Sequence, residues 1–141
     1  MLMKIKESEK KEKIKSPECT AQILRSILSY ESEIDQDKEH FWCLGLKTNN
    51  TIKYVELVSL GSLNEAIVAP REVFRLAISQ GVNSIVVGHN HPSGDTKPSN
   101  VDIHLTNKIK KAGDIIGIKL LDHVIIGEGS KSFSFLETNI L

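Results

Sequence analysis

Apolar residues recur along this chain at two spacings, and each spacing predicts its own kind of element. Spacings of three and four residues predict helices at residues 18–30, 70–80 and 100–112. Short runs rich in β-branched and aromatic residues predict strands at 41–48, 51–60, 63–69, 83–89 and 116–129. Asn49 and Asn50 separate the first two strands, and this pair favours a hairpin turn.

Residues that favour helix ends support these boundaries. Pro70 suits the first turn of the second helix, and Gly81 suits its C-terminal cap. The apolar face of this helix is predicted to consist of Val73, Phe74, Ala77 and Ile78. Ser99 is predicted to be the N-cap of the third helix, with Gly113 closing it.

The predicted order of elements indicates an α/β (α+β) fold, in which helices flank a mixed β-sheet. The 141 residues suffice for one domain with a core. Residues 1–16 are rich in Lys and Glu and poor in apolar side chains, so we expect a flexible charged leader before a domain at 17–141. The leader's six lysines against three glutamates leave a basic arm that touches nucleic acid as the alternative.

Composition narrows the possible functions. Eighteen basic residues balance eighteen acidic ones, which gives no electrostatic footprint for nucleic acid or an anionic membrane. No apolar run has the length of a membrane span, and the N-terminus lacks the apolar core of a signal peptide. Cys19 and Cys43 are far apart and outside any metal-binding spacing, which predicts reduced thiols in a cytoplasmic protein.

The stretch GHNHPSGDTKPSNVD (88–102) concentrates the candidate chemistry. On extended backbone His89 and His91 project to the same side, and a Pro-Gly loop allows Asp102 to approach them. Two imidazoles and a carboxylate are three ligands for a metal ion, with a fourth position left for water, as in catalytic zinc sites. Zn²⁺ lowers the pKa of bound water to roughly 7.

Each half of this pattern also has a simpler interpretation. A His-x-His pair occurs by chance, and Ser99-x-x-Asp102 alone is a capping box at a helix N-terminus. Their juxtaposition, with seven residues between His91 and Ser99, favours a metal site. The H-E-x-x-H and P-C-x-x-C patterns of other zinc enzymes do not occur in the sequence.

The same stretch is similar to the JAMM signature of MPN-domain metalloproteases. The chain most resembles the bacterial RadC-like (UPF0758-like) branch, through PREVFRLAI (70–78), HNHPSGD (89–95), PSNVD (98–102) and LLDHVIIG (120–127). The resemblance covers about residues 17–141. It implies the MPN/JAB (cytidine-deaminase-like) architecture, one zinc ion and hydrolysis of peptide or isopeptide bonds. Full-length RadC-like proteins usually carry an N-terminal helix-hairpin-helix region associated with DNA, for which this chain lacks room.

The resemblance also implies a role for each site residue. His89, His91 and Asp102 would bind the metal, and Ser99 would help to hold the reacting oxygen. The glutamate that acts as general base falls on Glu39, just ahead of an apolar strand. Three other acids also precede the histidines: Glu56, Glu65 and Glu72.

Further polar residues near these motifs receive secondary roles or none. Asp122 is a candidate acceptor for the second ring N–H of a metal-bound histidine, with a bond to local backbone as the alternative. His104 lies roughly 200° around the helix from Asp102 and should face away. His123 is not expected to be a ligand, and His40 is expected to be an ordinary surface or core histidine.

The leading prediction is a zinc-dependent metallopeptidase that acts on a peptide or protein substrate. One alternative is a DNA-repair-associated or DNA-binding accessory module without proteolytic activity, which the zero net charge disfavours. Another is a protein-interaction module with a degenerate site, which the intact His, His, Ser and Asp set disfavours. No membrane partner is expected, and the sequence predicts no oligomeric state.

Overall fold

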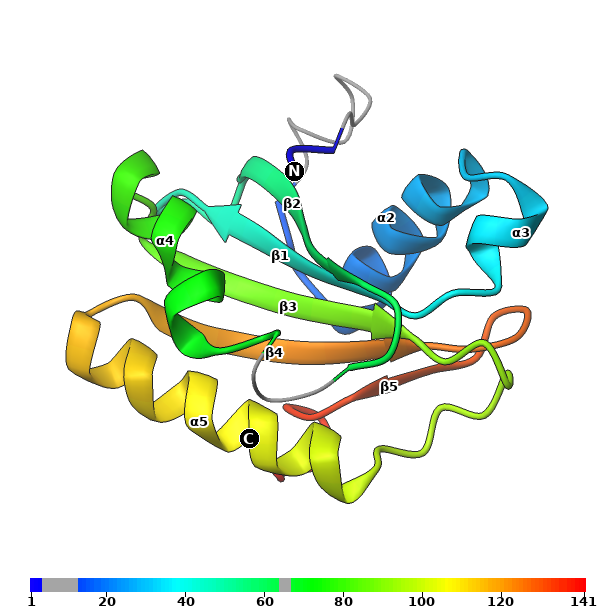
Figure 1. Ribbon diagram of the computed structural model, residues 1–141. Coiled ribbons are helices and arrows are strands. Elements are labelled where there is room, and N and C mark those ends of the chain that lie inside the picture. Colours follow the sequence, from blue (N-terminus) through cyan, green and yellow to red (C-terminus); the bar gives the residue numbers. More distant parts are fainter. Residues whose placement is uncertain (4–12, 64–66) are drawn as a thin grey trace.

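The computed structural model describes residues 1–3, 13–63 and 67–141, and these form a five-stranded sheet with helices on both faces (Figure 1). The strands are β1 (His40–Leu46), β2 (Ile52–Leu60), β3 (Ser84–Asn90), β4 (Lys119–Ile126) and β5 (Ser132–Ser134). The helices are α2 (Pro17–Ser29), α3 (Glu33–Gln36), α4 (Pro70–Gln80) and α5 (Asn100–Ile116). The predicted α+β fold with a mixed sheet is confirmed.

The strands lie in the order β2-β1-β3-β4-β5. β1 is antiparallel to both of its neighbours, and Asn50 at φ 65° forms the predicted hairpin between β1 and β2. β3 and β4 are parallel, and α5 makes the crossover that a parallel pair requires. This crossover places the end of β3 beside the start of α5.

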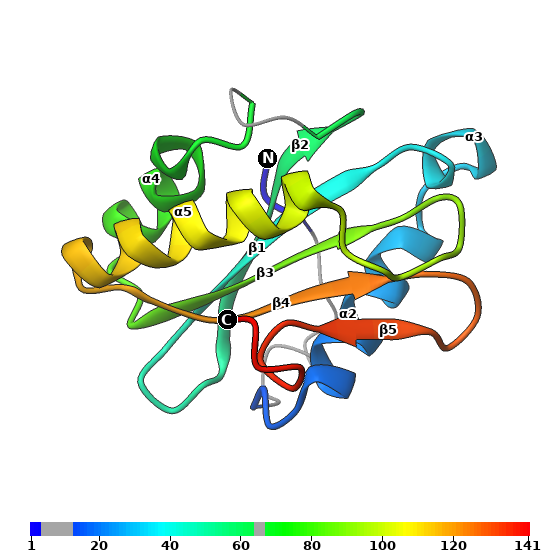
Figure 2. The same ribbon diagram turned by 90° about the horizontal axis from the view of Figure 1, so that it is seen from below.

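Two apolar layers cover the sheet, as Figures 1 and 2 show from two directions. α4 and α5 pack on one face around Phe41, Phe74 and Ile85, and α2 packs on the other around Leu24 and Trp42. Every residue of β1 and β3 is buried, because both faces of these central strands are covered. The middle of each sequence, FWCLGL in β1 and IVVG in β3, is therefore a continuous run without alternating polar residues.

Two predictions about residues 63–80 differ from the structure. Of the strand expected at 63–69, residues 64–66 lie outside the described part, and the described residues 67–68 are in a turn rather than a strand. Val68 from this run is fully buried in the core on the α4 side, which explains its apolar character without a strand. On α4, Val73, Phe74 and Ala77 are buried as predicted, but Ile78 is 58% exposed.

The predicted end of the third helix is also wrong. α5 continues past Gly113 to Ile116, and Gly117, at φ 88°, provides the left-handed C-cap. Gly113 lies inside the helix because a Cβ there would collide with the carbonyl oxygen of Ile118, where the chain returns to start β4. Glycine at position 113 therefore allows close packing and does not form a turn.

Two short elements were not predicted. α3 has four residues in the connector after α2, and the side chain of Ser32 accepts a hydrogen bond from the Asp35 N–H as its N-cap. β5 has three residues and pairs antiparallel with the end of β4. The predicted strand at 116–129 thus becomes β4, a turn and the approach to β5.

The described ends of the predicted leader lie along the outer edge of β2. Met1 exchanges backbone hydrogen bonds with Leu57, the Met3 N–H donates to the Val55 carbonyl, and the Ile14 N–H donates to the Asn50 carbonyl. Residues 4–12 lie outside the described part, and the domain boundary at residue 17 stays a prediction. No helix within residues 1–3, 13–63 and 67–141 is long and apolar enough to span a bilayer.

Candidate metal centre

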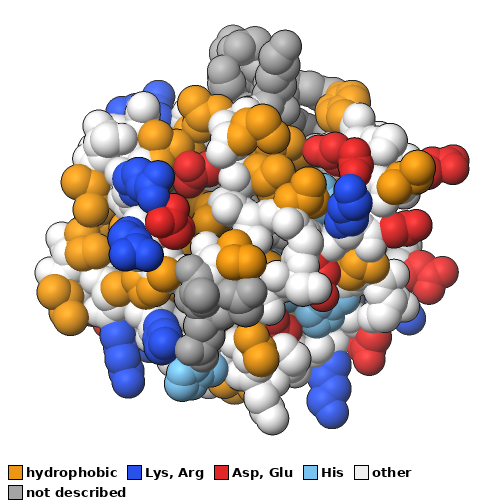
Figure 3. All heavy atoms as spheres, viewed as in Figure 1, with side chains coloured by type: hydrophobic (Ala, Val, Ile, Leu, Met, Phe, Trp, Pro, Cys, Tyr) orange, Lys and Arg blue, Asp and Glu red, His pale blue; other side chains and the backbone are white. Residues whose placement is uncertain are grey.

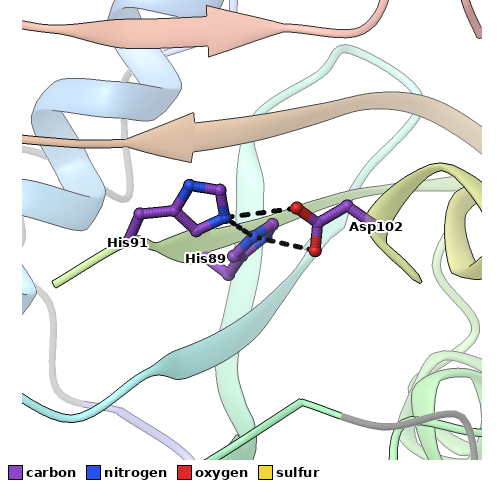
Figure 4. Close-up of side chains that lie close together, drawn as sticks. All are labelled: His89, His91 and Asp102. Atoms are coloured by element: carbon purple, nitrogen blue, oxygen red, sulfur yellow. Dashed lines mark hydrogen bonds and ion pairs between the residues drawn. The ribbon is translucent and has the colours of Figure 1, made fainter. Parts of the chain in front are cut away.

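Two histidines and an aspartate converge where β3 ends and α5 begins (Figure 4). His89 lies in β3 and His91 directly follows it, so strand alternation sends both side chains to one side. Asp102 is the third residue of α5, where it completes a capping box with Ser99. The Asp102 N–H donates to Ser99 Oγ over 3.1 Å, and the Ser99 N–H donates to Asp102 Oδ2 over 2.8 Å.

The three side chains are at metal-binding distances from one another. The Nε2 atoms of His89 and His91 are 2.9 Å apart. His89 Nε2 lies 3.3 Å from Asp102 Oδ1, and His91 Nε2 lies 3.2 Å from Oδ2. If each residue contributes one ligand atom, these three atoms lie within 4.8 Å of one another. These residues could therefore hold one metal ion.

The chemistry of these donors fits a divalent cation. His91 Nδ1 lies 2.8 Å from the carbonyl oxygen of Asp95, which can only accept, so this nitrogen carries the hydrogen. In neutral His91 the Nε2 atom then presents a lone pair towards the carboxylate of Asp102. Such converging lone pairs need a proton or a metal cation between them. Two imidazoles and one carboxylate suit zinc, and also iron or manganese.

Electrostatics keep the carboxylate ionised. Burial raises the pKa of Asp102, but the contacts of its carboxylate with the imidazole rings of His89 and His91 outweigh burial and hold its pKa below the usual range. The hydrogen bond to Asp102 raises the pKa of His91, whereas burial lowers the pKa of His89. His91 is therefore the histidine at which a proton competes best with a metal ion.

The predicted catalytic residues, Ser99 and Glu39, border the same cavity of about 680 Å³ as His91 and Asp102. Glu39 directly precedes β1, and the antiparallel register pairs Phe41 with His89. Strand alternation therefore sends Glu39, two residues before Phe41, towards the face that carries both histidines. Glu39 is half-buried, and its charge acts on both rings to raise their pKa.

Among the described residues, the other acids ahead of the histidines, Glu56 and Glu72, are not part of this site. Glu56 lies on β2 opposite Cys43, and Glu72 on α4 forms ion pairs with two arginines, Arg71 and Arg75. Glu65 lies outside the described residues. Figure 3 shows acidic side chains gathered on the side of the molecule that carries α3, and Asp37 from this region also borders the cavity.

His123 contacts the Nδ1 side of the His89 ring, and Thr106 in turn contacts His123. Sequence reasoning did not predict either contact. His123 Nε2 lies 2.7 Å from His89 Nδ1, and Thr106 Oγ1 lies 2.6 Å from His123 Nδ1. The parallel register pairs His123 with Val87, on the same face as His89. The only sequence signal was a histidine of unassigned role, together with a threonine one helical turn after Asp102.

Of the two roles considered for Asp122, the structure shows the bond to local backbone and not the bond to a metal-binding histidine. Its carboxylate accepts hydrogen bonds from Ser134 Oγ at 2.7 Å and from the His123 and Leu136 N–H groups. Neighbouring residues on a strand face opposite sides, so Asp122 points away from the side on which His123 meets His89. His104 is exposed on α5, as expected.

His40 is a core histidine, which is one of the two placements expected for it. It is fully buried, and its ring stacks on Trp42 with centroids 5.2 Å apart. Its Nδ1 atom lies 2.8 Å from the Lys38 carbonyl oxygen, so this nitrogen donates there. His40 is not among the three residues that could hold the metal ion.

Comparison with known proteins agrees with this geometry. The profile of the RadC-like JAB domain family matches residues 14–140. A UPF0758 protein of Caldanaerobacter subterraneus is 47% identical over 116 residues, which are 82% of this chain and 48% of the relative. A UPF0758 protein of Chlorobium phaeovibrioides is 50% identical over 107 residues, which are 76% of this chain and 48% of the relative.

The match to these relatives is partial in length and carries no statement of activity. The chain spans about half the length of the relatives it matches, and their names state no activity. The family profile nevertheless covers nearly all of the chain, including each residue of the candidate metal centre. The chain therefore belongs to the RadC-like JAB domain family.

Proposed function

We propose that this chain is a zinc-dependent metallopeptidase of JAMM type that hydrolyses a peptide or isopeptide bond. One observation carries the proposal: His91 and Asp102, two members of the ligand set, border a cavity that Glu39 and Ser99 also line, and the third member, His89, is buried beside them. A metal site with purely structural duties would have no need of a carboxylate and a hydroxyl at an open cavity beside it.

The chain's own residues supply the remaining chemistry. A bound zinc ion would act as a Lewis acid and lower the pKa of water. Glu39 then takes the proton from the attacking water and returns it to the leaving amine. Ser99 Oγ already accepts from the Asp102 N–H, which leaves the hydroxyl hydrogen available to donate to the developing oxyanion.

The surroundings of the cavity fit a polypeptide substrate. Pro92, Leu63 and Val101 give it apolar wall segments, whereas Asp37 and Glu39 give it negative charge. Lys38 also borders the cavity, but its ammonium is paired with Asp35 at 2.9 Å. This mixture of apolar and acidic surface suits an extended peptide segment better than the phosphate backbone of a nucleic acid.

The test combines metal analysis with cleavage. The purified chain should contain zinc and should cleave members of a peptide and isopeptide library, and a chelator should abolish cleavage. Glu39→Gln should retain zinc but lose about 10²–10⁴-fold in turnover, because it removes the general base. Glu33→Gln, an exposed acid on α3, is the matched control and should cleave like the wild type.

Two outcomes would contradict the proposal. Wild-type activity in a zinc-loaded Glu39→Gln variant would remove Glu39 from the reaction. A zinc-loaded wild type that cleaves nothing in the library, yet binds DNA with strong salt dependence in titrations at two salt concentrations, would favour the DNA-associated alternative.

A further inference from the structure

We infer that His123 and Thr106 are positioning residues that fix the tautomer of His89, so that His89 Nε2 presents its lone pair to the metal. The inference rests on the proposed metal site and concerns how the chain prepares that site. The three residues come from three elements, β3, α5 and β4. Their hydrogen bonds can be assigned in one direction only, starting from Thr106.

The Thr106 hydroxyl sets the direction. Its Oγ1 atom lies 2.6 Å from the carbonyl oxygen of Asp102 and 2.6 Å from His123 Nδ1. A carbonyl oxygen can only accept, so the single hydroxyl hydrogen points to Asp102. Thr106 Oγ1 can then only accept from His123, and His123 Nδ1 must carry a hydrogen.

The tautomer of His123 determines the tautomer of His89. The His123 ring is fully buried, stacked on Phe135 with centroids 4.6 Å apart and met edge-on by Phe41. These apolar surroundings favour the neutral ring, whose Nε2 atom is then a lone-pair acceptor. His89 Nδ1, 2.7 Å away, must therefore donate its hydrogen to His123, which leaves His89 Nε2 unprotonated.

His89 and His91 reach the same tautomer by different routes. His91 Nδ1 donates directly to the Asp95 carbonyl, as many metal-bound imidazoles do. His89 is too deep for a loop carbonyl and uses a second imidazole and a hydroxyl instead. The hydrogen bonds run from His89 through His123 and Thr106 to the backbone carbonyl of Asp102. The main chain of Asp102, a proposed ligand, therefore orients the ring of His89.

Nitrogen NMR of the zinc-free protein tests the assignment directly. Long-range ¹H–¹⁵N spectra, recorded above the ordinary histidine pKa of about 6.5, should show the Nδ1–H tautomer for both His89 and His123. A hydrogen on Nε2 of either neutral ring would overturn the inference. Because no metal is present, this readout does not depend on the proposed function.

A hydroxyl deletion tests the consequence for metal binding. Thr106→Val keeps the shape but removes the acceptor, so zinc affinity measured by competition with a chelator should fall about 10–100-fold. Thr106→Ser restores the hydroxyl and should restore most of the affinity. Thr20→Val removes a buried threonine from α2, on the opposite face of the sheet, and should bind zinc like the wild type.

The outcomes separate the two proposals. Wild-type zinc affinity in a folded Thr106→Val variant would overturn the positioning role. If the wild type bound no zinc but showed both Nδ1–H tautomers, the metallopeptidase proposal would fail and the tautomer assignment would stand. If Thr106→Val did not fold, the NMR spectrum of the wild type would decide.

Discussion

Asn90 lies between the two histidines of the metal centre, and its side chain performs a different task from theirs. Its Oδ1 atom accepts from the His40 N–H over 2.6 Å, and its Nδ2 donates to the Lys38 carbonyl over 3.0 Å. These two backbone groups flank Glu39. Asn90 therefore holds the backbone around Glu39, the proposed general base, against the end of β3, beside His89 and His91.

This clamp should make Asn90→Asp destabilising. Asn90 is 3% exposed, and the substitution would turn a donor into an oxygen that faces the Lys38 carbonyl. We expect the free energy of unfolding in urea to fall by about 1–3 kcal/mol. Asn83→Asp, at an exposed position before β3, should change it little. An Asn90→Asp variant as stable as the wild type would show that the clamp is unimportant.

A second prediction at this scale concerns pH. The hydrogen bond to Asp102 raises the pKa of His91 above its ordinary value of 6.5. Below that raised pKa the metal-free protein holds a proton on His91 that zinc must displace, so zinc affinity should decrease as pH falls through it. Chelator competition across pH measures this. An affinity that stays constant until well below pH 6.5 would contradict it.

The metal ligands were predictable from sequence because their geometry is local. Strand alternation places the side chains of His89 and His91 on one side of the sheet, and a capping box orients the side chain of Asp102 towards them. His123 was not predictable, because its contact with His89 depends on how β4 aligns with β3. Sequence reasoning left two roles open for Asp122, because only the sheet register decides which of two strand neighbours faces the site.

At the scale of elements, α5 shows how one residue type serves two purposes. Glycine at a helix end adopts a positive φ, whereas glycine inside a helix allows another segment to approach closely. Gly117 does the first and Gly113 does the second. Both positions look alike in the sequence, which explains why the predicted end of this helix was wrong.

Gly113→Ala should therefore lower stability, although alanine favours a helix by about 1 kcal/mol. The new Cβ would meet the Ile118 backbone carbonyl and lie 3.1 Å from the Phe74 ring, so overpacking of about 1–3 kcal/mol should prevail. Asn107→Ala, on the exposed face of α5, should instead be neutral or slightly stabilising. Chemical denaturation measures both, and a more stable Gly113→Ala variant would contradict the packing argument.

Element length limited the other predictions. α3 and β5 have four and three residues, which is too short for a hydrophobic period to appear. The longer helices α2 and α4 were placed within one residue of their observed ends. At the end of the run 63–69, the burial of Val68 in the core looks the same in sequence as burial in a sheet, although residues 67–68 are in a turn.

For the molecule as a whole, the metal centre joins the end of β3 to the first turn of α5, the helix that makes the crossover in the parallel part of the sheet. Zinc that binds only the folded state should therefore raise the midpoint of thermal unfolding. The stabilisation is about 2.7 kcal/mol at a zinc concentration 100 times the Kd. Differential scanning fluorimetry with and without a chelator measures the shift.

Two histidine variants check that this shift comes from the proposed site. His91→Ala should lose the zinc-dependent shift, and His104→Ala, at an exposed position of α5, should keep it. An equal shift in wild type and His91→Ala would show that the stabilising ion binds elsewhere.

The contacts of residues 1–3 and 14 along β2 also bear on how the protein behaves at high concentration. A bare strand at the side of a sheet can recruit strands from other molecules and seed fibrils. Here the chain's own first residues occupy Val55 and Leu57, and the opposite side ends in the three residues of β5. Within the part of the chain that the structure describes, the middle of β2 is thus paired and the strand at the other edge is short, so we expect the folded protein to resist fibril growth by strand addition.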